Sequence, residues 1–237
     1  MEKLKGLDLE GKKVLDAGTG ACGMTKHLED RGAEIISVDI NTEYLKQCKE
    51  QTETAQFLRA DLSDLTSLKS ETFDYVVCNF VISALSENKD IIITSVLREF
   101  EKVLKENGTL VIIDYYPFEE AKSPAPLDRS HIELWRLENA ISELIGEGHL
   151  EEYTPEVLEE ELNSIGFQNM GTSTLLEPVP WPIDLLREHE IVIKDNIDKL
   201  ESDRLKESLM CELEKIMDST EDRKIESGAI YELRAEK

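Results

Sequence analysis

The chain has 237 residues, a length that favours one elaborated domain or one domain with a lid. Of these residues, 40% are hydrophobic and 33% are charged, a composition typical of a globular protein. Its formal net charge of −24 argues against a nucleic-acid partner, because phosphate backbones repel an acidic surface. No apolar run reaches the roughly 18–20 residues of a membrane-spanning helix. The first residues also lack the apolar core of a secretion signal, so we expect no membrane span and a cytoplasmic location.

The first half of the chain alternates short apolar runs with helical patterns, which indicates a parallel sheet covered by helices on both faces. A glycine-rich turn follows the first strand and opens the first helix. The expected strands are 13–16, 34–38, 56–60, 73–78 and 109–115. The expected helices are 24–31, 43–50 and 88–106, the second capped by Asn41 or Thr42.

After Pro117 the pattern changes to a linker at 123–126 followed by mainly helical segments. The spacing Ser130-x-x-Glu133 predicts a capping box that starts a helix running to Ile145. Thr154 is expected to cap another helix, which ends at Gly166. Two further strands are expected at 167–176 and 229–235, with amphipathic helices at 183–200 and 203–217 between them.

The four cysteines show no C-x-x-C spacing. We therefore expect neither a zinc site nor a redox pair, and no bound metal. Four reduced thiols fit a cytoplasmic protein. The residues are Cys22, Cys48, Cys78 and Cys211.

Three acidic residues, Asp16, Asp39 and Asp61, each end a predicted strand at the edge where open α/β sheets bind ligands. The turn after Asp16 is rich in glycine, so its backbone N–H groups can approach a ligand closely. A carboxylate about 20 residues further on, at Asp39, is placed to bind a ribose diol. Adenosine is therefore the expected ligand.

The same turn matches G-x-G-x-x-G, the nicotinamide-dinucleotide fingerprint, through Gly18, Gly20 and Gly23. Asp16 is ill suited to a pyrophosphate on this turn but suits a ligand that carries ammonium and sulfonium groups. Asp61 adds an acceptor for an adenine amine. These two carboxylates favour a sulfonium nucleoside over a dinucleotide.

The segment Val14-Leu15-Asp16-Ala17-Gly18-Thr19-Gly20 resembles the first motif of class I S-adenosylmethionine-dependent methyltransferases. Further similarities follow in the family's order. They are the ribose-binding segment at 37–40, the adenine-binding segment at 60–62, the fourth-strand motif at 73–82 and the approaches to later strands at 103–110 and 165–167. The resemblance covers about residues 10–117 well and 154–177 and 226–236 loosely.

The resemblance implies a doubly wound, Rossmann-like α/β sheet of seven strands, mostly parallel with an antiparallel last strand, plus helical lid insertions. Residues 1–117 would form the S-adenosylmethionine-binding core. Residues 118–166 would form a helical lid or acceptor segment with a core helix. Residues 167–237 would add the last two strands, with a helical insertion at about 183–217.

The resemblance also assigns roles to the motif residues. Asp16, Gly18 and Gly20 would line the methionine part, Asp39 would hold the ribose, and Asp61 with the Leu62 backbone would read the adenine. The full predicted cofactor set is Asp16, Gly18, Thr19, Gly20, Asp39, Ile40, Asp61, Leu62 and Asn79.

Two features depart from the family pattern. Cys22 stands where many members have a third glycine. The fourth strand ends in Asn79-Phe80-Val81-Ile82, not in the Asn-Pro-Pro-aromatic signature of enzymes that methylate nucleic-acid amines. The second departure argues further against a nucleic-acid substrate.

Methyl transfer from a sulfonium is an in-line displacement, so alignment of acceptor and methyl carbon supplies most of the catalysis and a base is optional. The predicted catalytic residues are Asn79, near the sulfonium, with Tyr115 and His131 on the acceptor side. Asp114, Tyr116 and Glu133 are further candidates, although capping alone explains Glu133. Tyr115 and Tyr116 alternate faces of a strand, so at most one of them points into the site.

The expected function is therefore methylation of a small-molecule acceptor, with the helical insertions serving acceptor recognition or homodimer formation. Three alternatives stay open at this point. One is a nicotinamide-dinucleotide-dependent oxidoreductase, another is a non-catalytic partner protein that keeps the fold, and a minor variant is an aminopropyl transferase. The sequence identifies neither the acceptor nor the atom that is methylated.

Overall fold

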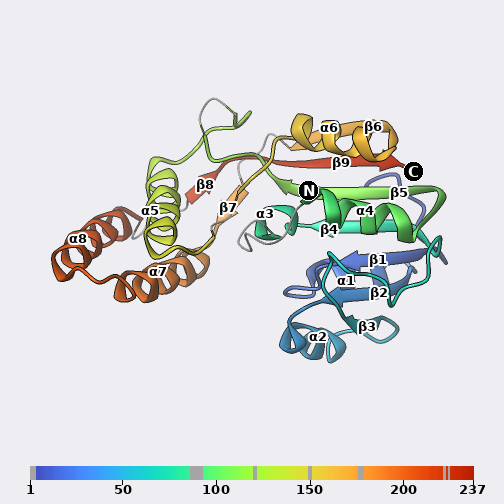
Figure 1. Ribbon diagram of the computed structural model, residues 1–237, viewed down its shortest axis with the longest axis horizontal. Helices are drawn as coiled ribbons and strands as arrows, with labels where there is room; N and C mark the ends of the chain where they lie inside the picture. Colours follow the sequence, from blue (N-terminus) through green and yellow to red (C-terminus); the bar gives the residue numbers. More distant parts are fainter. Residues whose placement is uncertain are drawn as a thin grey trace.

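The computed structural model describes residues 4–85, 93–119, 122–148, 151–175, 179–220, 223 and 225–237. These residues form a twisted main sheet with helices on both faces, and a helical lid at one end (Figure 1). The strands are β1 Lys13–Ala17, β2 Glu34–Asp39, β3 Gln56–Arg59, β4 Phe73–Asn79, β5 Leu104–Tyr115, β6 Gln168–Leu175, β7 Val179–Trp181, β8 Ile225–Ser227 and β9 Ile230–Glu236. The helices are α1 Gly23–Glu29, α2 Thr42–Lys49, α3 Ile82–Leu85, α4 Ile93–Val103, α5 Arg129–Ile145, α6 Pro155–Ile165, α7 Ile183–Asp198 and α8 Asp203–Thr220.

The main sheet has seven strands in the order β3-β2-β1-β4-β5-β9-β6. Strands β1 to β5 pair in parallel, and β9 runs antiparallel between β5 and β6. This confirms the predicted doubly wound sheet with an antiparallel last strand. The carboxyl ends of β1, β2, β3 and β4 therefore meet at one edge, which is where open sheets of this kind bind ligands.

Two apolar layers sandwich the sheet. On one face, α4 and α6 pack through side chains such as Phe100 and Leu162. On the other face, α1 and the segment that contains Leu4 and Leu9 pack against β1, β4 and β5. Burial on both faces explains why the central strands are nearly continuous apolar runs.

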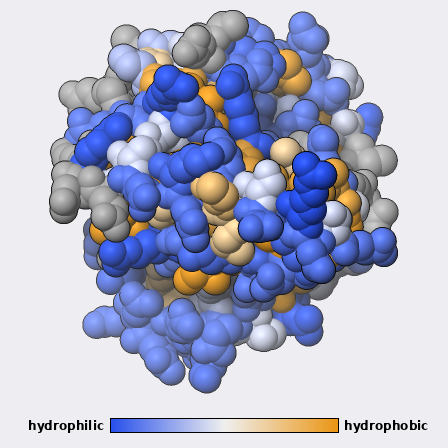
Figure 2. Space-filling model, turned by 90° about the vertical axis from the view of Figure 1, so that its left-hand side faces the viewer, coloured by the Kyte–Doolittle hydropathy of each residue, from blue (hydrophilic) through white to orange (hydrophobic). Residues whose placement is uncertain are grey.

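The helical lid comprises α5, α7 and α8 with the small β7-β8 sheet, and it has an apolar core of its own that includes Trp135, Ile193 and Leu213. Figure 1 shows this group beyond the carboxyl ends of the central strands, on the side of α3. Figure 2 faces this end of the molecule and shows apolar side chains scattered over a mostly hydrophilic surface. The β7-β8 pairing was not predicted, because three-residue strands leave no periodic pattern in a sequence.

The fourth helix and fifth strand meet earlier than predicted. Helix α4 ends at Val103 rather than Glu106, because Leu104 already pairs with Phe73 as the first residue of β5. The predicted start of this helix at Asn88 lies outside the described residues.

The predicted capping box at Ser130 is wrong. Helix α5 is capped by Asp128, whose carboxylate accepts a hydrogen bond from the Ser130 backbone N–H at 2.9 Å. Glu133 instead pairs with Arg129 at 2.8 Å on the surface. Ser130 lies within the first turn, where its hydroxyl contacts the Ser219 hydroxyl at 2.9 Å.

The expectation of four reduced thiols is also wrong. Cys22, just before α1, and Cys48, near the end of α2, form a disulfide. Both residues are buried, and their Cα atoms are 5.1 Å apart. The two residues are 26 positions apart in the sequence and come together only in the folded chain, which spacing alone does not reveal. Cys78 and Cys211 are free.

Candidate cofactor and acceptor site

The turn between β1 and α1 is built around Gly18. Its φ of +91° is a conformation that side-chain-bearing residues rarely adopt, and a Cβ there would lie 2.4 Å from Val81 Cγ2. The backbone N–H groups of Gly18 and Thr19 donate to the Val38 carbonyl at 2.8 and 3.1 Å. The turn is thus fixed against the ends of β2 and β4, with no side chain at Gly18 to hold a ligand away.

Asp39, at the end of β2, joins this turn to the next one. Its two carboxylate oxygens accept hydrogen bonds from the backbone N–H groups of Gly20 at 3.0 Å and Asn41 at 2.8 Å. A carboxylate has about four lone-pair positions, so these bonds leave acceptor capacity for a diol. The backbone fixes the carboxylate in place before any ligand arrives.

Asp61 follows β3 and forms a compact turn of its own. One of its oxygens accepts from the Ser63 backbone N–H at 2.8 Å and from the Ser63 hydroxyl at 2.7 Å. Nearby, Ile40 and Tyr44 expose 60% and 44% of their surface, although both are large and apolar. An exposed apolar pair beside a polar acceptor fits the flat face and the amine edge of an adenine ring.

A cleft of about 730 Å³ collects these residues at the carboxyl ends of the strands. The predicted residues that line it are Gly18, Gly20, Asp39, Ile40, Asp61, Leu62 and Asn79. A second hollow of about 590 Å³ adds Thr19 and shares Gly18, Gly20, Asn79 and Phe80 with the first. The two hollows therefore form one elongated cleft across the ends of β1, β2 and β4.

Asp16 lies beneath the turn and not on the wall of this cleft. It is fully buried, and its Oδ2 accepts hydrogen bonds from the hydroxyls of Thr25 at 2.6 Å and Ser37 at 2.8 Å. Burial raises the pKa of this carboxyl to about 6, although the two hydroxyl bonds oppose the shift. Its Oδ1 has no hydrogen-bond partner. A buried acceptor without a partner is costly, so a cationic group in the cleft has an electrostatic reason to settle near it.

These observations fit an adenosyl group with a cationic amino-acid tail. Asp39 would hold the ribose, Asp61 and the Leu62 backbone would face the adenine, and the Gly18–Gly20 turn with Asp16 beneath it would face the amino-acid part. Because Gly18 lies close to Val81, this position has no room for a side chain of its own.

The predicted catalytic residues are separated by the structure. Asn79 lines both parts of the cleft. The Tyr115 ring stacks on Phe80 with centroids 4.5 Å apart, and burial raises the Tyr115 pKa to about 12. His131 is buried in the lid against Trp181, with ring centroids 4.0 Å apart, and it lines neither part of the cleft.

The further base candidates point elsewhere. Asp114 is buried and accepts hydrogen bonds from the Ser83 backbone N–H at 3.1 Å and hydroxyl at 2.9 Å. The Tyr116 hydroxyl bonds Thr174 at 2.6 Å. Tyr115 and Tyr116 pack on opposite faces of the sheet, as their alternation predicts.

Sequence reasoning missed three residues on or near the cleft. Phe80 and Tyr44 line it, and Trp181 packs against Tyr115 with ring centroids 5.8 Å apart. Phe80 directly follows the predicted strand-end residue Asn79, which was a usable signal. Nothing in the sequence links Trp181 to this edge of the sheet.

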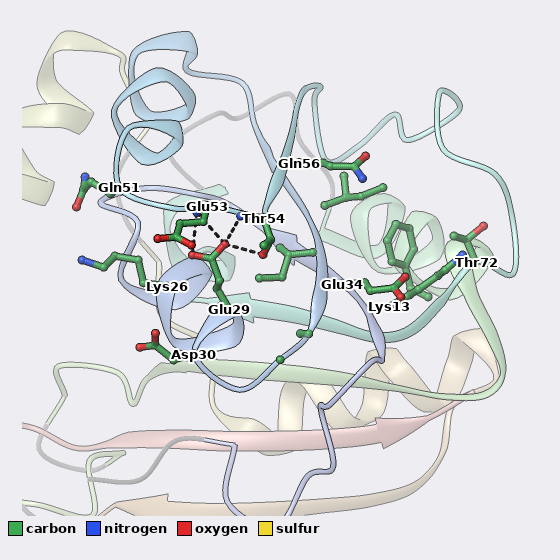
Figure 3. Close-up of a pocket in the computed structure, with 15 residues that line it drawn as sticks. Lys13, Lys26, Glu29, Asp30, Glu34, Gln51, Glu53, Thr54, Gln56 and Thr72 are labelled. Carbon is green, nitrogen blue, oxygen red and sulfur yellow. Dashed lines mark hydrogen bonds between the residues drawn. The ribbon is translucent and has the colours of Figure 1, made fainter.

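A larger hollow, of about 970 Å³, lies at the amino ends of the strands (Figure 3). Its wall includes Lys13, Glu34 and Gln56, the first residues of β1, β2 and β3. Glu29 projects from α1 and accepts backbone hydrogen bonds from Glu53 at 3.0 Å and from Thr54 at 2.6 Å. This carboxylate caps a turn, and the hollow lies at the opposite edge of the sheet from the strand-end acids.

Comparison with known proteins agrees with this geometry. Residues 15–112 match the family model described as "Methyltransferase domain". This match confirms the resemblance, seen in the motifs, to the class I S-adenosylmethionine-dependent methyltransferases over that stretch of the chain. Within the described residues, no helix is long and apolar enough to cross a membrane.

Two curated relatives match part of the chain. Malonyl-[acyl-carrier protein] O-methyltransferase of Enterobacter lignolyticus is 26% identical over 98 residues, which are 41% of this chain and 37% of that protein. Demethylmenaquinone methyltransferase of Thermotoga maritima is 24% identical over 131 residues, 54% of this chain and 55% of that protein. The matched regions thus span between about a third and a half of these relatives.

A solved structure matches the fold more completely. A SAM-dependent methyltransferase from Archaeoglobus fulgidus superposes with a TM-score of 0.58 at 19% identity, covering 96% of this chain and 86% of that one. At this identity the likeness concerns the fold alone, and it includes the part of the chain outside the family match.

Proposed function

We propose that the protein transfers a methyl group from S-adenosylmethionine to a small-molecule acceptor by in-line displacement. The observation that carries this proposal is the single cleft that joins Asp39 and Asp61 to Asn79 and Phe80. It supplies acceptors for a nucleoside through Asp39 and Asp61, and it is also lined by Phe80, whose ring stacks on Tyr115. The curated relatives named above carry methyltransferase names, and the second is named for demethylmenaquinone.

When bound, the cofactor supplies a methyl group on a positively charged sulfur. The protein's own residues then bind the cofactor, align the acceptor with the methyl group and exclude water. Asp39 anchors the ribose, and Asp16 stiffens the turn through Thr25 and Ser37 while its free oxygen attracts positive charge. Asn79 lines both hollows, which supports a role for its amide beside the transferred group.

None of the predicted acceptor-side candidates lines the cleft with Asn79, although the described imidazole of His27 does. Tyr115 stays a neutral phenol near neutral pH, since its pKa is raised to about 12, and so positions an acceptor rather than taking its proton. Asp114 is occupied by Ser83. The predicted bases therefore stay out of the cleft, and alignment of the acceptor with the methyl group provides the rate.

Isothermal titration calorimetry tests the cofactor. S-adenosylhomocysteine should bind, and NAD⁺ and NADP⁺ should not; tight binding of a dinucleotide instead would favour the oxidoreductase alternative. Incubating the protein with methyl-labelled S-adenosylmethionine and fractionated small metabolites then tests turnover. Cofactor binding without any labelled product would favour a non-catalytic protein of this fold.

The net charge of −24 supports a small-molecule acceptor over nucleic acid. Apolar side chains exposed on the lid, among them Leu144, Ile191 and Val192, support a homodimer through the helical insertions. Light scattering across a concentration series measures that association. A cytoplasmic location is part of the proposal, although the Cys22–Cys48 disulfide is of a kind more common in oxidising compartments.

A further inference from the structure

Both tryptophans of the chain lie together in the lid, beside two of its four histidines. Trp135 and His131 come from α5, Trp181 ends β7, and His189 lies on α7. The His131 ring lies 4.0 Å from that of Trp181 and 4.4 Å from that of Phe118, measured between centroids. These rings enclose a narrow crevice that the proposed cofactor chemistry does not use.

Two polar atoms in the wall of the crevice have no hydrogen-bond partner. They are Nε1 of Trp181, a residue only 7% exposed, and Nδ1 of His131, which is 2% exposed. The crevice is too narrow to admit a water molecule, so solvent does not satisfy them in this arrangement. Buried polar groups normally have hydrogen-bond partners, so a buried group without one needs an explanation, such as a role in binding a ligand.

A row of packed aromatic rings lies between the crevice and the cofactor cleft. Trp181 lies 5.8 Å from Tyr115, and Tyr115 lies 4.5 Å from Phe80, between ring centroids. Phe80 lines both parts of the cofactor cleft. An acceptor that reaches the transferred methyl group past Phe80 and Tyr115 would therefore extend toward Trp181 and His131.

We propose that this crevice is the subsite for the far end of the methyl acceptor, and that it binds a planar, uncharged group whose oxygen accepts a hydrogen bond from the Trp181 indole N–H. This inference rests on the proposed methyltransferase function. The indole N–H only donates, so the ligand must supply an acceptor atom. The surrounding rings select a flat, apolar group around that atom.

The charges in the wall exclude a carboxylate as that group. Glu138 lines the crevice, and its carboxylate already has a partner, His189 Nδ1, at 2.8 Å. Burial lowers the pKa of His131 to about 4, so its ring is uncharged near neutral pH. An anionic ligand would thus meet Glu138 without a free positive charge to offset it.

Binding requires the crevice to widen. Its walls come from α5, α7 and β7, which pack around one apolar core, so a ligand must separate these elements slightly. The two unpartnered atoms favour this, because the closed, empty form leaves both unsatisfied while a ligand oxygen satisfies at least Trp181. The ligand thereby selects an open form of the lid.

The two indole N–H signals in an ¹⁵N-correlated NMR spectrum report on the crevice directly, since the chain has 2 tryptophans. Trp135→Phe and Trp181→Phe assign the signals. We expect acetophenone to shift the Trp181 signal saturably, with benzoate and toluene each binding at least about fivefold more weakly, the scale of one hydrogen bond. No saturable shift with acetophenone, or equal affinity for toluene, would overturn the proposal.

The two assignment variants also form a matched pair. Trp181→Phe keeps a ring but removes the donor, and should weaken acetophenone binding by about fivefold, followed at the Trp135 signal. Trp135→Phe keeps both unpartnered atoms but trims a ring of the wall, so it should weaken acetophenone binding less than Trp181→Phe does. Equal losses in both variants, with unchanged thermal unfolding, would assign the binding to ring packing and overturn the hydrogen-bond role.

The titrations use protein without cofactor, and S-adenosylhomocysteine binding is measured separately by calorimetry. If acetophenone does not bind at the crevice while S-adenosylhomocysteine binds normally, this inference alone is refuted. Absence of S-adenosylhomocysteine binding would refute the proposed function.

Discussion

The carboxylate of Asp39 accepts a hydrogen bond from the backbone N–H of Gly20 at 3.0 Å, so the acid that follows β2 is fastened to the turn that follows β1. Its second oxygen is fastened to the Asn41 backbone in the same way, at 2.8 Å. The site proposed for the ribose is therefore rigid before binding, and the loss of this side chain should affect both the ligand and the turn.

Asp39→Ala should weaken S-adenosylhomocysteine binding by about 1–3 kcal/mol, the scale for losing hydrogen bonds to a charged group. Calorimetry measures the change. Glu207→Ala, which removes an exposed acid on α8, is the charge-matched control and should leave the affinity unchanged. Wild-type affinity in Asp39→Ala would contradict the ribose assignment.

Gly18→Ala should destabilise the fold by about 1–3 kcal/mol through backbone strain and should also reduce cofactor affinity. The new Cβ would lie 2.4 Å from Val81 Cγ2, at a φ of +91°. Adding Val81→Ala removes the clash but not the backbone strain, so it should restore part of the stability. Thermal unfolding of the single and double variants separates the steric clash from the backbone strain. Wild-type stability in Gly18→Ala would refute both the clash and the strain.

Because of Asp16, the free energy of unfolding should rise as the pH falls. Its carboxyl has a pKa of about 6 in the folded protein against 3.8 for an aspartate in the unfolded chain, so the folded state binds the proton more tightly. The ionised form therefore destabilises the fold above pH 6, and this penalty disappears as the pH falls from 6 to 3.8. At roughly 1.4 kcal/mol per pKa unit, the penalty is at most about 3 kcal/mol.

Thermal unfolding of wild type and Asp16→Asn at pH values across that window isolates this contribution. Wild type should gain stability relative to the variant as the pH is lowered. Asp30→Asn, at an exposed position after α1, serves as the control and should follow wild type. A difference between wild type and Asp16→Asn that stays constant with pH would show that Asp16 is not perturbed by burial.

Asp128→Ala should cost about 1–2 kcal/mol of unfolding free energy, because it removes the N-cap of α5 and the ion pair with Arg223. Glu133→Ala should cost less than about 0.5 kcal/mol, because its pair with Arg129 is on the surface. Chemical denaturation of both variants measures the contrast. A larger loss of unfolding free energy in Glu133→Ala than in Asp128→Ala would instead support the capping box that the sequence predicted.

The disulfide should be detected by mapping thiols in the folded protein. Peptides that contain Cys22 and Cys48 should be linked, and Cys78 and Cys211 should be free. Cys22→Ser with Cys48→Ser should lower the unfolding free energy by about 3–4 kcal/mol, the entropic estimate for a loop of this length. Alkylation of all four thiols under native conditions without a reductant would refute the bridge.

The parallel core was predictable because its strands are apolar runs that end in Asp or Asn, and these endings mark the edge where the chain turns. Asp39 and Asp61 were predicted on that basis, and both line the cleft. Asp16 was predicted by the same pattern, yet its side chain is turned under the glycine-rich turn toward Thr25 and Ser37. A strand-end position specifies the edge, but the neighbouring hydroxyls decide where the carboxylate points.

The lid was less predictable. Its helices have clear periodicity, but the partners of their apolar faces depend on how residues far apart in the chain pack together. Trp181 meets His131, 50 positions earlier in the numbering, only because β7 and α5 fold into one cluster. The disulfide has the same origin: Cys22 and Cys48 are 26 residues apart and meet only through the layering of α1 and α2.

The position of β9 between β5 and β6 has a consequence for synthesis on the ribosome. Strands β1 to β5 can pair with one another as soon as residue 115 has emerged. Strand β6, at 168–175, has no neighbour in the main sheet until residues 230–236 follow it. Until then the nascent chain exposes an unpaired strand edge, the situation in which chaperones most often protect a folding protein from aggregation.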